Sequence, residues 1–238
     1  MSDIPDPDAL FRALAETWPA AAEHRAGAWL LREGAGAGSR VSSARPLGPV
    51  GSSDLPLLQD AAARLGQSPL VQVRAGQDAL DAMLAAAGYA LRDETLIMAA
   101  PVGALPPASR MTAFALWPPL GIQRDIWAES GIGAARQAVM ERVTGPKAAL
   151  LGRLSDRAAG VGFVAVSEGI AFVSAVAVLP AFRRQGCARN MMGAAAHWAQ
   201  AAGATHLALA VTRANEEAGA LYASLGMEVV GKYHYRAK

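Results

Sequence analysis

The stretch AVAVLPAFRRQGCARNMMGAAAHWAQAAGA (residues 175–204) runs from an apolar, strand-like segment through a short basic turn into a long alanine-rich helical pattern. Pro180 ends the strand because it lacks the amide that a sheet ladder needs. The free amides of a helix's first turn, together with the helix dipole, form a ready site for anions. Arg183 and Arg184 add positive charge there, and Gly186 has no Cβ to obstruct a phosphate. The turn is therefore a candidate phosphate site, although a solvated basic turn would carry the same residues.

The bulk composition of the 238-residue chain is that of a folded globular protein, with 53% hydrophobic and 18% charged residues. A net charge of +2 is too balanced to favour nucleic acid or a membrane surface as a partner. Cys187 is the single cysteine, which excludes an intrachain disulfide and fits a reducing compartment. No secretory signal opens the sequence, and the longest apolar run, 169–182, is shorter than the roughly 20 residues of a membrane span. We expect a cytoplasmic protein, either a monomer or a homodimer.

Hydrophobic periodicity predicts a mixed α/β architecture. Residues 26–48 indicate two strands joined by a glycine-rich turn; this turn, GAGAGS, has neither the spacing nor the following helix of a nucleotide loop. Proline clusters at 101–110 and 115–121 interrupt regular structure, and we place a domain boundary near residue 115. Downstream, the pattern predicts helices at 122–131 and 133–143 and strands at 147–155, 158–168 and 169–179.

The order helix, strand, helix, strand occurs twice in the sequence. It is predicted first over residues 55–100 and again over 191–236. Aligning Gly88 with Gly226 sets an offset of 138 residues, which also pairs Val73 with Val211. We interpret this correspondence as an internal duplication, with 1–115 and 116–238 as its two halves.

Two motifs in the second half resemble those of the GNAT superfamily of N-acetyltransferases. The acetyl-coenzyme A loop of that family has Arg or Gln, two residues, Gly, one residue, then Gly or Ala, and Arg183, Gly186 and Ala188 occupy those positions. The second motif is an Asn that leads a helix carrying Leu-Tyr and ending in Gly plus a large apolar residue. Its residues here are Asn215, Leu221, Tyr222, Gly226 and Met227. The departures are Met227, where an aromatic residue is commoner, and Ala188 in place of Gly.

The resemblance implies two GNAT-like domains, each with a mixed, mostly antiparallel twisted sheet flanked by helices, and acetyl-CoA as co-substrate. The strand before the loop would pair through its backbone with the pantetheine arm, and the loop amides would bind the pyrophosphate. A backbone N–H near Val178 could stabilise the oxyanion formed when an amine attacks the thioester. The implied coenzyme-binding residues are Val176, Ala177, Val178, Arg183, Arg184, Gln185, Gly186, Cys187, Ala188 and Asn215.

Tyr222 is the implied catalytic residue, as the acid that protonates the departing thiolate. A phenol pKa of about 10 facing a thiol pKa of about 8.5 leaves a mismatch of only about 2 kcal/mol. Packing as a core aromatic is the alternative for this side chain. No general base is assigned: Glu168 is the acid nearest in sequence to the coenzyme strand, Ser174 lies within it, and a solvated turn is the plainer interpretation of Glu168.

Other residues permit a chemical and a structural interpretation. Cys187 at a helix N-terminus could form an acyl-cysteine, but apolar packing is favoured because no histidine is near it in sequence except His197. The four histidines show no metal-binding spacing, so no metal is expected. Trp117 and Trp127 could line an acceptor pocket, although core packing is favoured for both.

The first half reads as a degenerate copy that does not bind the coenzyme. Leu84 stands where Tyr222 stands in the repeat, and Pro46 and Pro49 remove amides that a phosphate would need. We therefore predict an acetyl-CoA-dependent N-acetyltransferase that acts on a primary amine of a small molecule or protein. The alternative is a non-catalytic coenzyme A-binding or interaction module.

Overall fold

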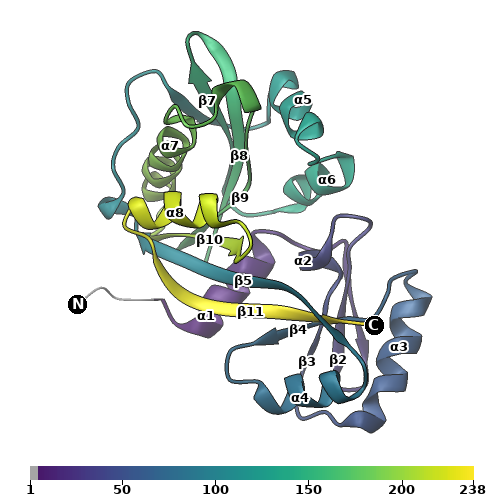
Figure 1. The fold of residues 1–238 in the computed structure, drawn as a ribbon. Helices are drawn as coiled ribbons and strands as arrows, with labels where there is room; N and C mark the ends of the chain where they lie inside the picture. Colours follow the sequence, from purple (N-terminus) through teal and green to yellow (C-terminus); the bar gives the residue numbers. More distant parts are fainter. Residues whose placement is uncertain (1–4) are drawn as a thin grey trace.

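In the computed structural model, which describes residues 5–238, the strands form one mixed sheet with the order β1-β2-β3-β4-β11-β5-β10-β9-β8-β7-β6 (Figure 1). The mixed α/β sheet flanked by helices confirms the predicted fold class. Pairing is antiparallel except for β3 with β4 and β9 with β10. The strands are β1 Ala22–Ala26, β2 Trp29–Glu33, β3 Ala44–Pro46, β4 Leu70–Arg74, β5 Ala90–Pro101, β6 Ala113–Leu116, β7 Lys147–Leu154, β8 Arg157–Ser167, β9 Ile170–Val178, β10 His206–Thr212 and β11 Glu228–Ala237.

The helices bury apolar stripes against both faces of the sheet. Alternate residues of β7 point to opposite faces: Ala148 and Leu150 pack in the core under α7, and Ala149 packs in the core under α5 and α6 (Figure 1). Among the described residues, no helix is long and apolar enough to cross a membrane. The α-helices are α1 Pro7–Glu16, α2 Ser39–Ser42, α3 Leu55–Arg64, α4 Asp78–Ala86, α5 Gly121–Glu129, α6 Ala134–Arg142, α7 Cys187–Ala201 and α8 Glu216–Ser224.

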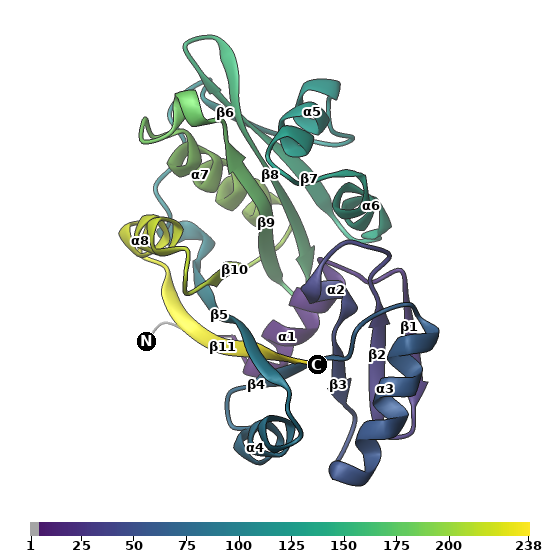
Figure 2. The same cartoon turned by 45° about the vertical axis from the view of Figure 1, so that its right-hand side comes forward.

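The two halves exchange their last strands. β5, from the first half, pairs with β10 of the second half, and β11, from the second half, pairs with β4 of the first. β5 and β11 also pair with each other, so a single sheet runs through both halves (Figure 2). Asp81 of α4 fixes β11 in place, because its carboxylate accepts hydrogen bonds from Arg236 Nε at 2.7 Å and His234 Nε2 at 2.6 Å.

The structure repeats with the offset that the sequence predicts. Helices α4 and α8 begin 138 residues apart, at 78 and 216, and end 138 residues apart, at 86 and 224. Strands β5 and β11 begin at 90 and 228, with the same spacing. Gly88 and Gly226, which end the two helices, have φ values of +82° and +81°. The tandem arrangement is thus visible in matching elements as well as in sequence.

Two features of the fold differ from what the sequence pattern indicates. Strands β1 and β6, and helix α2 within the predicted two-strand region 26–48, are additional to the predicted elements, and the boundary near residue 115 falls inside β6. The proline-rich connection before β6 runs against α7, where a Cβ on Gly193 would lie 2.5 Å from the Pro106 oxygen. Because the sheet is continuous, the division of the chain into domains at 115 stays a prediction.

Candidate active site

The basic turn ends in a helix N-terminus that faces open space. Pro180–Phe182 forms a single 3-10 turn after β9, and Gly186 then adopts the left-handed conformation, with φ +84°, directly before α7. No side chain caps the helix, so the amides of its first turn remain available. A Cβ added at Gly186 would meet nothing within 4 Å. The turn therefore has both the donors and the room that an anionic group needs.

Strands β9 and β10 diverge next to this turn. They pair in parallel only from Ile170 with His206 to Val173 with Leu209. Ala175, with φ +53°, forms a bulge that shifts the register of β9 against β8. Beyond the bulge, β9 stays paired with β8 on one side and has no ladder partner on the other among residues 5–238.

The open edge of β9 presents the amides of alternate residues. The Leu179 N–H donates to Ala159 of β8 at 2.9 Å. Because successive amides of an extended strand point in opposite directions, the backbone groups of Val178 and Val176 face away from β8. The Val178 carbonyl accepts a hydrogen bond from Arg183 Nε at 3.2 Å, and the amide beside it is directed toward the same open edge.

Trp127 supports the bulge from α5. Its indole Nε1 donates to the Ala175 carbonyl at 2.9 Å, and the side chain is fully buried. Trp117 is half-buried, with its ring centroid 5.9 Å from that of Phe163 and the Lys147 ammonium over its face. Both tryptophans pack in the core, as favoured, and Trp127 also makes a hydrogen bond to the bulge that sequence periodicity could not reveal.

The other polar side chains of the turn contact protein groups. Arg184 is exposed and forms an ion pair with Glu217 of α8 at 3.3 Å. Gln185 donates to the Ala181 carbonyl at 3.1 Å. An exposed ion pair contributes little to stability, so Arg184 can exchange Glu217 for an anionic ligand at small cost.

Two cavities adjoin the diverging strands. One, of about 320 Å³, lies along residues 176–180 and is closed by Glu129 and Ser130 at the end of α5. The other, of about 260 Å³, lies at the bulge and takes residues from both halves; we call it the interhalf cleft. Its walls include Arg40, Asp93, Arg136, Ala175, Thr212 and Tyr235. Sequence reasoning missed these charged residues, because the contributing segments are far apart in the chain.

Residues 6–236 match the family described as "Probable histone acetyltransferase Rv0428c C-terminal". The chain belongs to this family, and it is an acyltransferase of the GNAT superfamily. No functionally curated protein matches the sequence significantly.

Solved structures of acetyltransferases share the fold at low sequence identity. A GCN5-related N-acetyltransferase from Kribbella flavida superposes with a TM-score of 0.70 at 19% identity, over 97% of this chain and 93% of that chain. A GCN5-related N-acetyltransferase from Sphaerobacter thermophilus gives 0.58 at 15% identity, over 89% and 76%. A tandem GNAT protein from the clavulanic acid biosynthesis pathway gives 0.60 at 14% identity, over 82% and 74%. These likenesses support the fold and the tandem arrangement.

Tyr222 of the acyltransferase lies buried on α8, in the core that α7 also covers. Burial raises the pKa of its phenol to about 12. Transfer of a proton to a thiolate whose conjugate acid has a pKa of about 8.5 is then uphill by about 5 kcal/mol. This environment suits Tyr222 as a hydrogen-bond donor to a thiolate better than as a full proton donor, and its catalytic role stays a prediction.

Asn215 and Cys187 have structural contacts that the motifs alone do not show. The Asn215 side chain caps α8 by accepting from the Ala218 amide at 3.2 Å. The Cys187 thiol is buried, and a Cβ on Gly152 would lie 2.6 Å from its sulfur, so glycine makes room for it. Burial raises the pKa of this thiol, which disfavours the thiolate that an acyl-cysteine mechanism needs. The favoured interpretation of Cys187, apolar packing, agrees with this geometry.

Glu168 lies at the far end of β9 from the basic turn. Both of its carboxylate oxygens accept hydrogen bonds from Arg12 of α1, at 2.8 and 3.0 Å. The hydrogen bond from Arg12 lowers the pKa of Glu168. Ser174 accepts a hydrogen bond from Arg40 at 3.2 Å. Glu168 is therefore a turn residue, as favoured, but it is paired with Arg12 rather than only solvated, and the general base stays unassigned.

Proposed function

We propose that the chain is an acetyl-CoA-dependent N-acetyltransferase that transfers the acetyl group to a primary amine of a small molecule or protein. The observation that carries the proposal is the divergence of β9 and β10 beyond Val173, beside the uncapped N-terminus of α7. Open strand amides beside free amides at a helix N-terminus supply the donors that an extended, phosphate-bearing ligand needs. A cytoplasmic location is part of this proposal.

The residues present fit the coenzyme. Open backbone groups of Val176 and Val178 match the amide groups of a pantetheine arm laid along β9 as an additional strand. The amides of α7 and the unobstructed Gly186 suit the pyrophosphate, and Arg184 contributes charge at the rim. When bound, acetyl-CoA supplies the activated thioester.

The protein's own groups then act on the carbonyl oxygen and the thioester sulfur, the two atoms that gain negative charge. Attack of a neutral amine on the carbonyl carbon creates an oxyanion, and the Val178 amide on the open edge is suited to donate to it. Collapse of this adduct breaks the carbon–sulfur bond and releases a thiolate, toward which Tyr222 donates a hydrogen bond. The proton of the amine leaves through an unassigned base or through water.

The rival function is a coenzyme A-binding module without catalysis. The presence of Tyr222 at the tyrosine position of the second GNAT motif favours an enzyme over a binding module. Release of free coenzyme A from acetyl-CoA should be measured with a panel of amino acids, peptides, polyamines and aminoglycosides. At least one acceptor should give amine-dependent release that disappears in Gly186→Val. Tight coenzyme binding without release for any amine would favour the binding module.

A further inference from the structure

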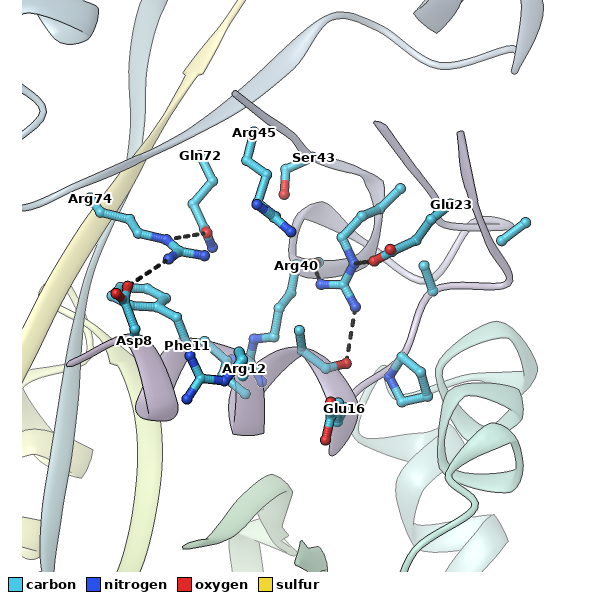
Figure 3. Close-up of a pocket in the computed structure, with 16 residues that line it drawn as sticks. Asp8, Phe11, Arg12, Glu16, Glu23, Arg40, Ser43, Arg45, Gln72 and Arg74 are labelled. Carbon is cyan, nitrogen blue, oxygen red and sulfur yellow. Dashed lines mark hydrogen bonds and ion pairs between the residues drawn. The ribbon is translucent and has the colours of Figure 1, made fainter. Parts of the chain in front are cut away.

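A further polar cavity lies in the first half and shares Arg40 with the interhalf cleft. It encloses about 610 Å³ between α1 and the strands β1 to β4, and we call it the arginine cavity (Figure 3). This volume is in the range of small-molecule sites. The charged side chains that line it are Arg12, Arg32, Arg40, Arg45 and Arg74, with Asp8, Glu16 and Glu23.

Two of these arginines are held by protein groups, although Arg32 Nε makes no hydrogen bond within residues 5–238. Arg12 forms the bidentate pair with Glu168. Arg32 is buried and donates to the carbonyls of Arg40 at 2.7 Å, Trp18 at 3.0 Å and Ala15 at 3.1 Å, and Glu23 lies 3.6 Å from its Nε. These arginines hold the walls of the cavity together.

Arg45 and Arg74 lack comparable partners. Half-buried Arg45 forms no side-chain hydrogen bond or ion pair within residues 5–238. Arg74 makes a 3.4 Å contact with Gln72 and a 3.9 Å contact with Asp8, whose side chain is 80% exposed, and its guanidinium carbon lies 3.9 Å from the centroid of the Phe11 ring, a cation–π contact that leaves its hydrogen-bond donors free. Burial, followed by the charge of Arg45, lowers the pKa of Arg74 to about 10. Two like charges thus share a partly desolvated space, and an anion between them would stabilise both.

Buried neutral donors stand beside the two guanidinium groups. Gln72 is 9% exposed and Ser43 is 4% exposed, and both line the same cavity. Figure 3 shows Arg45, Arg74, Gln72 and Ser43 extending from the strands toward the space above α1. Arginine guanidinium groups, together with amide and hydroxyl donors, typically bind carboxylate or phosphate oxygens.

The internal repeat explains where this cavity comes from. β3 and β4 are parallel neighbours joined at only one residue pair, Ala44 with Val71, so they diverge as β9 and β10 do. With the 138-residue offset, Gln72 and Arg74 correspond to positions 210 and 212, which line the interhalf cleft. The first half has therefore kept the opening between its parallel strands and filled its wall with arginine.

We propose that the arginine cavity binds a compact anion with two or more negative charges, a phosphate- or carboxylate-bearing small molecule, between Arg45 and Arg74. Coenzyme A does not fit this site in the way proposed for the second half, because Pro46 and Pro49 remove backbone donors after β3. The proposal does not depend on the acyl-transfer reaction.

The test is calorimetric titration of the full chain carrying Gly186→Val, which removes the coenzyme loop as a competing phosphate site. Pyrophosphate, inorganic phosphate, citrate and succinate are titrated separately at low ionic strength, where ion pairing is least screened. At least one should bind with one site per chain. Preference for pyrophosphate or inorganic phosphate identifies the anion as a phosphate, and preference for citrate or succinate identifies it as a carboxylate.

Arg45→Gln and Arg74→Gln, each added to that background, should weaken binding at least tenfold. Arg64→Gln is the matched control, since Arg64 is an exposed arginine on α3 outside the cavity. Thermal melting without ligand should show that Arg45→Gln is folded and no less stable, because it removes charge repulsion. Absence of binding by all four anions, or binding that survives both cavity substitutions, would overturn the proposal.

Discussion

Val173 of β9 and Leu209 of β10 form the last Cα pair between two parallel strands that diverge beyond them. The divergence leaves Val176 and Val178 with open backbone groups, close to the free amides of α7. The bulge at Ala175 lies directly beyond this last pair, where the open edge of β9 begins. The predictions below test what this arrangement does.

Substitution of Gly186 tests the phosphate loop. Gly186→Val should weaken acetyl-CoA binding at least tenfold, because a β-branched side chain would occupy the open space before the α7 amides. Gly203→Val is the matched control: Gly203 has φ +83° and also has no atom within 4 Å of an added Cβ, so it carries the same backbone strain. Calorimetry should separate the two variants, and equal affinities would remove the phosphate role.

Trp127 tests whether the bulge matters for binding. Trp127→Phe deletes the hydrogen bond to the Ala175 carbonyl while keeping an aromatic ring in the core. Acetyl-CoA affinity should fall several-fold, since the open edge of β9 loses its support. Trp29→Phe, which deletes a comparable indole hydrogen bond to Asp54 in the first half, serves as control. If both variants bind the coenzyme like the parent, Trp127 only fills the core.

Tyr222→Phe tests the leaving-group role. The ring and its packing remain, so coenzyme binding should survive, while turnover should fall about a hundredfold if thiolate stabilisation limits the rate. Because burial raises the phenol pKa to about 12, its ionisation should cause no loss of activity below about pH 10. Tyr89→Phe, at a buried tyrosine of the first half, is the control. Parent-like turnover by Tyr222→Phe would leave Tyr222 a packing residue.

The exchanged strand β11 gives a stability prediction. Hydrogen bonds from Arg236, then from His234, lower the pKa of Asp81 from its ordinary value of 3.8 to about 2. The stability that Asp81 contributes is thus present above about pH 4 and is lost as the pH falls toward 2. Asp81→Asn should lower the free energy of unfolding by about 1 to 2 kcal/mol at pH 7.

Urea unfolding at pH 7 and pH 3 measures this contribution. The difference between Asp81→Asn and the parent should shrink at the lower pH. Asp60→Asn, at an exposed position of α3, should have the same free energy of unfolding as the parent at both pH values. A penalty that is independent of pH would mean that the carboxylate charge does not hold β11.

Local sequence signals predicted the parts of the fold that depend on near neighbours. The turn and helix after β9, the two matching helices and the offset between the halves follow from glycine, proline and apolar spacing within short windows. The exchange of β5 and β11 was not predictable, because which strand fills a place in the sheet depends on residues more than a hundred positions apart. β1 was missed because its interior residues, 23–25, are exposed and lack the alternation of a half-buried strand.

The candidate site likewise has a part that the sequence could indicate and a part that it could not. The proposed coenzyme loop is one contiguous motif, so it could be proposed from the sequence alone. The interhalf cleft combines Arg40, Asp93 and Arg136, which only the folded sheet brings together. The arginine cavity could likewise not be predicted, since Arg45 and Arg74 lie on separate strands that only the folded sheet brings to one cavity.

The most direct test of the central claim is calorimetric titration of the full chain with acetyl-CoA. We predict one binding site per chain, lost in Gly186→Val and kept in Arg45→Gln, because Pro46 and Pro49 remove backbone donors from the turn of the first half that corresponds to the basic turn of the second. Two sites per chain, or one site that survives Gly186→Val, would contradict the account.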